Sequence, residues 1–110
     1  MFIISSKKST LLFSVVSGLA MLASTPSFAA DGKELYTSKG CIACHGADAK
    51  TPIMPTYPKI SGQSKEYTIQ QLNDIKSGAR SNGQSAAMKG VMAAVSDDEI
   101  SALAEYLSGL

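Results

Sequence analysis

The segment that decides the fold is Lys39-Gly40-Cys41-Ile42-Ala43-Cys44-His45-Gly46, in which a histidine directly follows two cysteines spaced C-x-x-C. Two thiols three positions apart on one turn of backbone can each form a thioether to the same edge of one porphyrin. The histidine then meets the iron from that side. This pattern is the attachment signature of c-type haem. The sequence therefore predicts one covalent haem c, with Cys41 and Cys44 as its thioether residues and His45 as an axial iron ligand.

The first 29 residues have the features of a secretory signal peptide. Lys7 and Lys8 form a basic start, residues 11–23 are an uncharged apolar run of thirteen, and small residues precede an expected cleavage after Ala29. Export would place the mature chain in the periplasm. A hydrocarbon core needs about 20 apolar residues, so we expect no stable membrane insertion after cleavage. An uncleaved N-terminal anchor stays open.

Residues 30–110 form the expected mature chain, which is short enough to be a single domain. Without the signal peptide it has eight basic and nine acidic side chains, a formal charge of −1. No basic face is present to indicate nucleic-acid binding. A domain this small rarely buries enough apolar surface without a staple. A covalently held apolar cofactor would complete its core.

Capping and hydrophobic periodicity indicate an all-α fold of three or four short helices, because no stretch alternates with period two. Asp31 and Ser64 are expected to cap the first two helices, and Gly40 and Gly78 to end them. A short helix or turn is expected within residues 86–95, and residues 46–63 are expected to form a loop along the haem edge. The last helix follows a capping box at Ser96-Asp97-Asp98-Glu99 and buries Ile100, Leu103, Ala104 and Leu107.

With these elements in order, the chain resembles the class I cytochrome c family, and more narrowly small bacterial periplasmic monohaem cytochromes. The motif at 41–45 and the segments at 57–63 (YPKISGQ) and 88–97 (MKGVMAAVSD) carry the resemblance. It covers residues 31–108 and implies the small cytochrome c fold, wrapped around one haem with a His/Met-ligated iron. It also implies that the first and last helices cross. Gly32 and Leu35 would then meet Leu103 and Tyr106.

The second axial ligand is left open by the residues alone. His45 is the only histidine, and Met54, Met88 and Met92 are the methionines of the mature chain. In the family, the ligand is a methionine eight residues before the serine that caps the last helix, which selects Met88. Met92 is the reserve and would otherwise pack on the ring.

The family also implies that a loop proline carbonyl accepts a hydrogen bond from the far ring nitrogen of His45. We expect Pro55 to supply this carbonyl, with Pro58 as the reserve. Arg80 and Lys59 can be considered as partners for the haem propionates, although solvated surface charges are the favoured interpretation for both.

An iron with two protein ligands has no open coordination position, so the expected function is electron transfer without enzymatic chemistry. The expected partners are redox proteins: dehydrogenases, membrane cytochrome complexes, oxidases or reductases. The alternative is a five-coordinate haem protein acting as a gas sensor or a peroxidase-like enzyme. A dithiol redox protein would need alternating strands and helices, which the sequence lacks. A zinc site would need a fourth ligand, and because no further cysteine or histidine exists, a carboxylate would have to supply it. Both alternatives are disfavoured.

Overall fold

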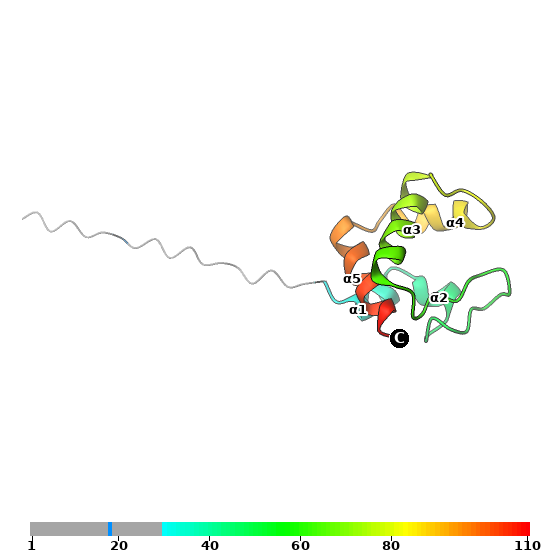
Figure 1. The fold of residues 1–110 in the computed structure, drawn as a ribbon, viewed down its shortest axis with the longest axis horizontal. Helices are drawn as coiled ribbons and strands as arrows, with labels where there is room; N and C mark the ends of the chain where they lie inside the picture. The colour runs from blue at the N-terminus through cyan, green and yellow to red at the C-terminus, as the bar shows by residue number, and fades with distance from the viewer. Residues whose placement is uncertain (1–17, 19–29) are drawn as a thin grey trace, which may run out of the picture.

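The computed structural model describes Gly18 and residues 30–110. The predicted signal peptide, residues 1–29, therefore lies outside the described residues except for Gly18. Five helices follow one another along the described chain: α1 (Gly32–Ser38), α2 (Cys41–His45), α3 (Lys65–Ser77), α4 (Ser85–Met92) and α5 (Asp97–Ser108) (Figure 1). The described residues contain no strand, which confirms the predicted all-α class. The one helix beyond the predicted three or four is α2, formed by the C-x-x-C-H motif itself.

Helix α1 begins and ends where its capping residues predict. The Asp31 carboxylate accepts hydrogen bonds from the backbone N–H groups of Lys33 and Glu34, at 3.0 and 3.3 Å. Lys39 caps the other end, and Gly40 has the left-handed φ of 81° that separates α1 from α2. This turn aims the motif away from the axis of α1.

The crossing of α1 and α5 is close enough to require a glycine. A Cβ atom on Gly32 would lie 2.2 Å from the Ala102 carbonyl oxygen and 2.6 Å from the Tyr106 Cβ. One turn further along α1, the rings of Tyr36 and Tyr106 meet with centroids 5.8 Å apart, tilted by 50°. The predicted contact between the first and last helices is therefore present, and Tyr36 adds to it.

Helix α5 buries the stripe that its periodicity predicts. Ser96 and Glu99 form both halves of the capping box, and Ile100, Leu103, Ala104 and Leu107 are all buried. Three of these side chains belong to one hydrophobic core with residues of α1, α3, the end of α4 and the loops: Leu35, Tyr36, Ala49, Leu72, Ile75, Met92, Val95, Ile100, Leu103 and Leu107.

Helix α3 starts at its predicted cap, Ser64, and ends at Gly78, whose φ is 87°. It packs against α5 on one side and against α4 on another. Among the described helices, α4 packs against α3 alone. None of the described helices is long and apolar enough to cross a membrane.

The predicted loop between α2 and α3 is held by its own hydrogen bonds. The Ala49 carbonyl accepts from the N–H groups of Ile60 and Ser61, at 2.9 and 3.2 Å, and Ala49 is fully buried at a φ of 58°. Gly62 N–H donates to the Leu107 carbonyl at 2.8 Å, which fixes the far end of the loop to α5. The loop therefore holds a defined position beside α2.

Candidate haem-binding site

A cavity of about 430 Å³ lies where α2, α3 and α4 meet the loop between α2 and α3 and the residues between α3 and α4. Its volume is within the range of small-molecule and cofactor sites. In Figure 1, α2 lies below and α4 above on the same side of the molecule, and both contribute residues to the cavity wall. A second, more open depression of about 760 Å³ lies between α1 and α5, and no cysteine, histidine or methionine lines it.

Most of the cavity wall is apolar. The side chains that line it include Ile60, Leu72, Ile75, Met88, Val91 and Leu107. Thr56 to Ile60 and Gln63 also line it, so the second half of the loop between α2 and α3 borders the cavity. Tyr67 of α3 is 52% exposed and also lies on this wall. An apolar wall of this kind suits a porphyrin and keeps water from its metal.

The three motif residues all line this cavity. Cys41, Cys44 and His45 come from α2, with both cysteines half-buried and His45 only 5% exposed. Burial raises the pKa of the Cys41 thiol above its ordinary value. The structure therefore brings together both predicted thioether residues and the predicted axial histidine.

His45 is oriented by the carbonyl of Pro58. The His45 Nδ1 atom lies 2.9 Å from this oxygen. A carbonyl can only accept, so Nδ1 carries the proton and donates, and Nε2 keeps the lone pair that a metal needs. The prediction of Pro55 as acceptor is wrong. Tyr57 N–H donates to the Met54 carbonyl at 3.1 Å and closes a turn that contains Pro55. Pro55 does not line the cavity, whereas Pro58, directly after the turn, does.

Tyr36 fixes the other end of the motif and was missed by the sequence reasoning. Its buried hydroxyl donates to the Gly46 carbonyl at 2.6 Å. Burial, with a smaller contribution from Cys41, raises the pKa of Tyr36 to about 12, so the phenol stays a donor at neutral pH. Gly46 has a φ of 87°, and a Cβ there would lie 2.2 Å from the Thr51 carbonyl oxygen. Gly46 could have been singled out from the sequence, because it directly follows the motif. Nothing in the local pattern indicated a role for Tyr36.

The three candidate methionines occupy different environments. Met88 is half-buried and lines the cavity. Met92, one turn further along α4, is 1% exposed and belongs to the hydrophobic core. Met54 is 45% exposed and is not part of the cavity wall. Met88 is thus the one of these three thioethers that shares the cavity with His45.

Lys59 and Arg80 are the lysine and arginine side chains on the described cavity wall, and no carboxylate lines it. Arg80 is held in place, since its Nη1 donates to the Gln71 side-chain oxygen at 3.0 Å and its backbone N–H donates to the Asp74 carbonyl at 2.9 Å. The wall therefore offers positive charge to an anionic edge of a cofactor. With two thiols, an oriented imidazole and a thioether, the donor set fits a haem.

Comparisons with known proteins identify the same family along most of the chain. A family model described as "Cytochrome c" matches residues 29–110. A thiosulfate dehydrogenase electron acceptor of Stutzerimonas stutzeri (strain A1501) is 39% identical over 98 residues, 83% of this chain and 44% of that protein. Cytochrome c-553 of Nitratidesulfovibrio vulgaris (strain DSM 19637 / Miyazaki F) is 32% identical over 104 residues, 94% of this chain and 99% of that protein.

The fold has a relative among solved structures. The crystal structure of reduced recombinant cytochrome c4 from Pseudomonas stutzeri matches with a TM-score of 0.65 and 34% identity, covering 78% of this chain and 50% of that one. The chain spans about half the length of the cytochrome c4 and electron-acceptor relatives, and nearly all of the cytochrome c-553.

The fold and the cavity define a small all-helical protein with one attachment site for haem c. The chain belongs to the cytochrome c family, as a bacterial class I member, which confirms the resemblance noted from its sequence. Membership implies a covalent haem c with its iron and a role in electron transfer, and Cys41 and Cys44 fit the attachment motif of the family.

Proposed function

We propose that the protein is a periplasmic carrier of single electrons whose haem iron is ligated by His45 and Met88. The observation that supports this most strongly is the placement of the methionines. Met88 lines the cavity that His45 also lines, whereas Met92 is in the core and Met54 is exposed. Met92 therefore keeps a packing role within the protein core.

The chain would control the haem through its two axial side chains. When bound, the haem supplies the one-electron couple of its iron. The Pro58 carbonyl holds the imidazole of His45 in one tautomer and increases the basicity of the free nitrogen. The soft thioether of Met88 favours the reduced metal and raises the reduction potential relative to two nitrogen ligands. With His45 and Met88 both holding the iron, no coordination site would remain for substrate, so the protein would carry electrons without acting as an enzyme.

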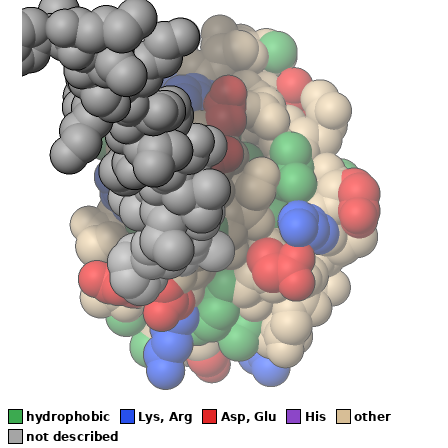
Figure 2. All heavy atoms as spheres, turned by 90° about the vertical axis from the view of Figure 1, so that its left-hand side faces the viewer, with side chains coloured by type: hydrophobic (Ala, Val, Ile, Leu, Met, Phe, Trp, Pro, Cys, Tyr) green, Lys and Arg blue, Asp and Glu red, His purple; other side chains and the backbone are tan. Residues whose placement is uncertain are grey.

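Redox proteins are the proposed partners. A relative of this chain is named an electron acceptor of thiosulfate dehydrogenase, which supports a dehydrogenase as the class of donor. That relative is about twice as long as this chain, so its name alone does not identify the partner of this chain. Membrane cytochrome complexes, oxidases and reductases are therefore proposed as partners as well. Acidic and basic side chains are interspersed on the face shown in Figure 2, and the expected mature charge is −1, so electrostatic steering towards any partner would be weak. The periplasmic location rests on the signal-like residues 1–29.

The ligand assignment is tested by comparing two methionine variants of the haem-loaded protein. Met88→Ala should abolish the far-red absorption band of ferric iron bound to a thioether and lower the reduction potential by more than about 100 mV, which corresponds to more than a tenfold change in the one-electron equilibrium. Met92→Leu conserves volume in the core and should change neither. Loss of the band in Met92→Leu but not in Met88→Ala would move the ligand to Met92.

A further inference from the structure

Helix α4, which carries Met88, is attached to few other elements. Among the described helices it packs against α3 alone. Its N-terminal cap, Gln84, makes no side-chain capping bond. The position of Met88 therefore depends strongly on how the chain is held at the other end of α4, where it continues through Ala93, Ala94 and Val95 into α5.

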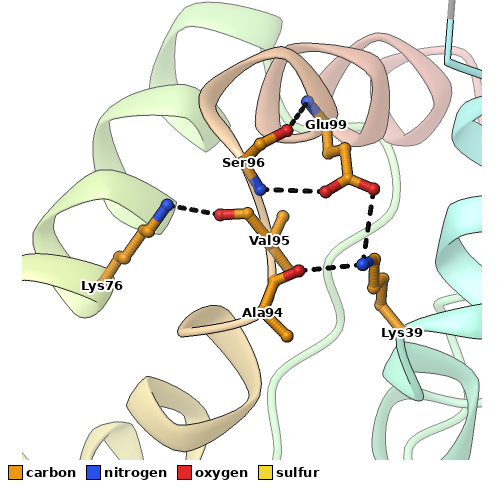
Figure 3. A network of polar contacts seen from close by, with 6 residues as sticks. All are labelled: Lys39, Lys76, Ala94, Val95, Ser96 and Glu99. Carbon is orange, nitrogen blue, oxygen red and sulfur yellow. Dashed lines mark hydrogen bonds and ion pairs between the residues drawn. The ribbon is translucent and has the colours of Figure 1, made fainter.

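Two lysines from different helices hold this joint between α4 and α5. Lys39, the residue that caps the end of α1, donates from its Nζ to the Ala94 carbonyl at 2.8 Å. Lys76, in the last turn of α3, donates from its Nζ to the next carbonyl, that of Val95. Figure 3 shows the two ammonium groups approaching the two consecutive carbonyls from different helices. Hydrogen bonds from a charged donor are about twice as strong as neutral ones.

Glu99 completes the network. One of its carboxylate oxygens accepts from the Ser96 N–H at 3.0 Å, and the other lies 3.4 Å from the Lys39 Nζ (Figure 3). The side chains of Lys39 and Glu99 are only 26% and 23% exposed, so solvent screens this pair less than an exposed one. Glu99 therefore holds the Lys39 ammonium against the joint.

The network links the two sides of the haem site. Lys39 comes two residues before Cys41, at the start of the segment that carries His45. Ala94 comes six residues after Met88. One ammonium group therefore connects the segment with the histidine to the segment with the methionine, and Lys76 adds α3, the helix between them, to the same joint.

We propose that Lys39 and Lys76 are positioning residues that keep Met88 on the iron by clamping the α4–α5 joint. This inference rests on the proposed ligation by Met88. Neither lysine touches the iron. Without these bonds α4 keeps its contact with α3 but loses its fixed end, so the thioether leaves the metal more often and an external ligand can take its place.

The test measures the apparent affinity of the ferric, haem-loaded protein for imidazole. Binding is monitored by the loss of the far-red absorption band of iron bound to a thioether. Lys39→Met and Lys76→Met should each raise the apparent affinity for imidazole about tenfold, because each loses one charge-assisted hydrogen bond. Lys39→Arg keeps a cationic donor, so its affinity for imidazole should stay close to that of the wild-type protein. If Lys76→Met yields no holoprotein, Glu99→Gln provides the second variant, with a smaller rise expected.

Lys65→Met is the matched control, because Lys65 also lies on α3 and pairs with α5, its Nζ 3.0 Å from the Glu105 carboxylate, but away from the joint. It should leave the imidazole affinity unchanged. Equal affinities in Lys39→Met, Lys76→Met and wild type would overturn the clamp, and so would an equal rise in Lys65→Met. If Met88→Ala itself leaves the band and the affinity unchanged, the proposed ligation fails and the clamp fails with it. If Met88→Ala behaves as expected and the lysine variants do not, only the clamp fails.

Discussion

Single backbone carbonyls determine how the motif residues are presented. The Pro58 carbonyl selects the tautomer of His45, and the Gly46 carbonyl ties the end of α2 to Tyr36 on α1. Both acceptors belong to residues outside the helices. Gly46 directly follows α2, and Pro58 directly follows the turn at 54–57. The chemistry of the site is therefore set by side chains whose partners are backbone atoms 10 and 13 residues away in sequence.

Removing the hydroxyl of Tyr36 should destabilise the protein without removing haem. In Tyr36→Phe the buried Gly46 carbonyl keeps the Ala49 N–H, 3.2 Å away, but loses the phenol donor. Loss of this one hydrogen bond should cost about 0.5–1.5 kcal/mol of the free energy of unfolding. Urea unfolding of the ferric holoprotein measures this. Tyr106→Phe is the control, since Tyr106 packs against the same ring but donates no bond to this turn. Equal stability of Tyr36→Phe and wild type would show that the bond does not hold the motif.

Residue-level contacts of this kind were the least predictable from the sequence. The motif residues were found because covalent attachment fixes their spacing. The choice between Pro55 and Pro58 depends on the turn at 54–57, which no local pattern specifies. The bonds from Lys39 and Lys76 join residues 55 and 19 positions apart, and a lone lysine carries no sign of such a partner.

At the scale of elements, prediction succeeded where a helix carries its own start and stop signals. Helices α3 and α5 begin directly after their predicted caps, Ser64 and Ser96, and the buried stripe of α5 is the one its periodicity predicts. The motif helix α2 has only five residues and begins at a glycine without a side-chain cap, so it gave no signal of its own. The path of the loop is set by its bonds to Ala49 and Leu107, and these depend on the tertiary fold.

The capping box of α5 makes stability dependent on pH in the acid range. Hydrogen bonds from Ser96, and then the charge of Lys39, hold the pKa of Glu99 below its ordinary value. Because the folded-state pKa is the lower one, this stabilisation is fully present above about pH 4.3, the unfolded value, and is lost as the pH falls through the folded-state pKa.

Glu99→Gln should therefore be less stable than wild type at pH 7, and its melting temperature should fall less steeply between about pH 5 and pH 3. Some slope remains, since a backbone bond from Lys50 also lowers the pKa of Asp48. The control is Glu66→Gln, which removes an acid from the first turn of α3, where no capping box forms. Parallel pH profiles for Glu99→Gln and wild type would contradict this account.

At the scale of the molecule, a domain of about 80 residues has a small core. The cavity is lined by residues of α2, α3, α4 and α5 and of the loops before α3 and α4, but by none of α1. A covalent haem in this place joins elements that otherwise touch little. Helix α4 makes its helix contacts with α3 alone, yet its residue Met88 lines the same cavity as the motif. Haem attachment and folding are therefore expected to be coupled in this chain.

The most direct test of the ligation by His45 and Met88 is the absorption spectrum of the ferrous wild-type protein before and after addition of carbon monoxide. With both axial positions held by side chains, the spectrum should stay unchanged, since the gas finds no open position. A shift to the spectrum of a carbon monoxide complex at neutral pH would show an open coordination site and would replace the electron carrier with a ligand-binding haem protein.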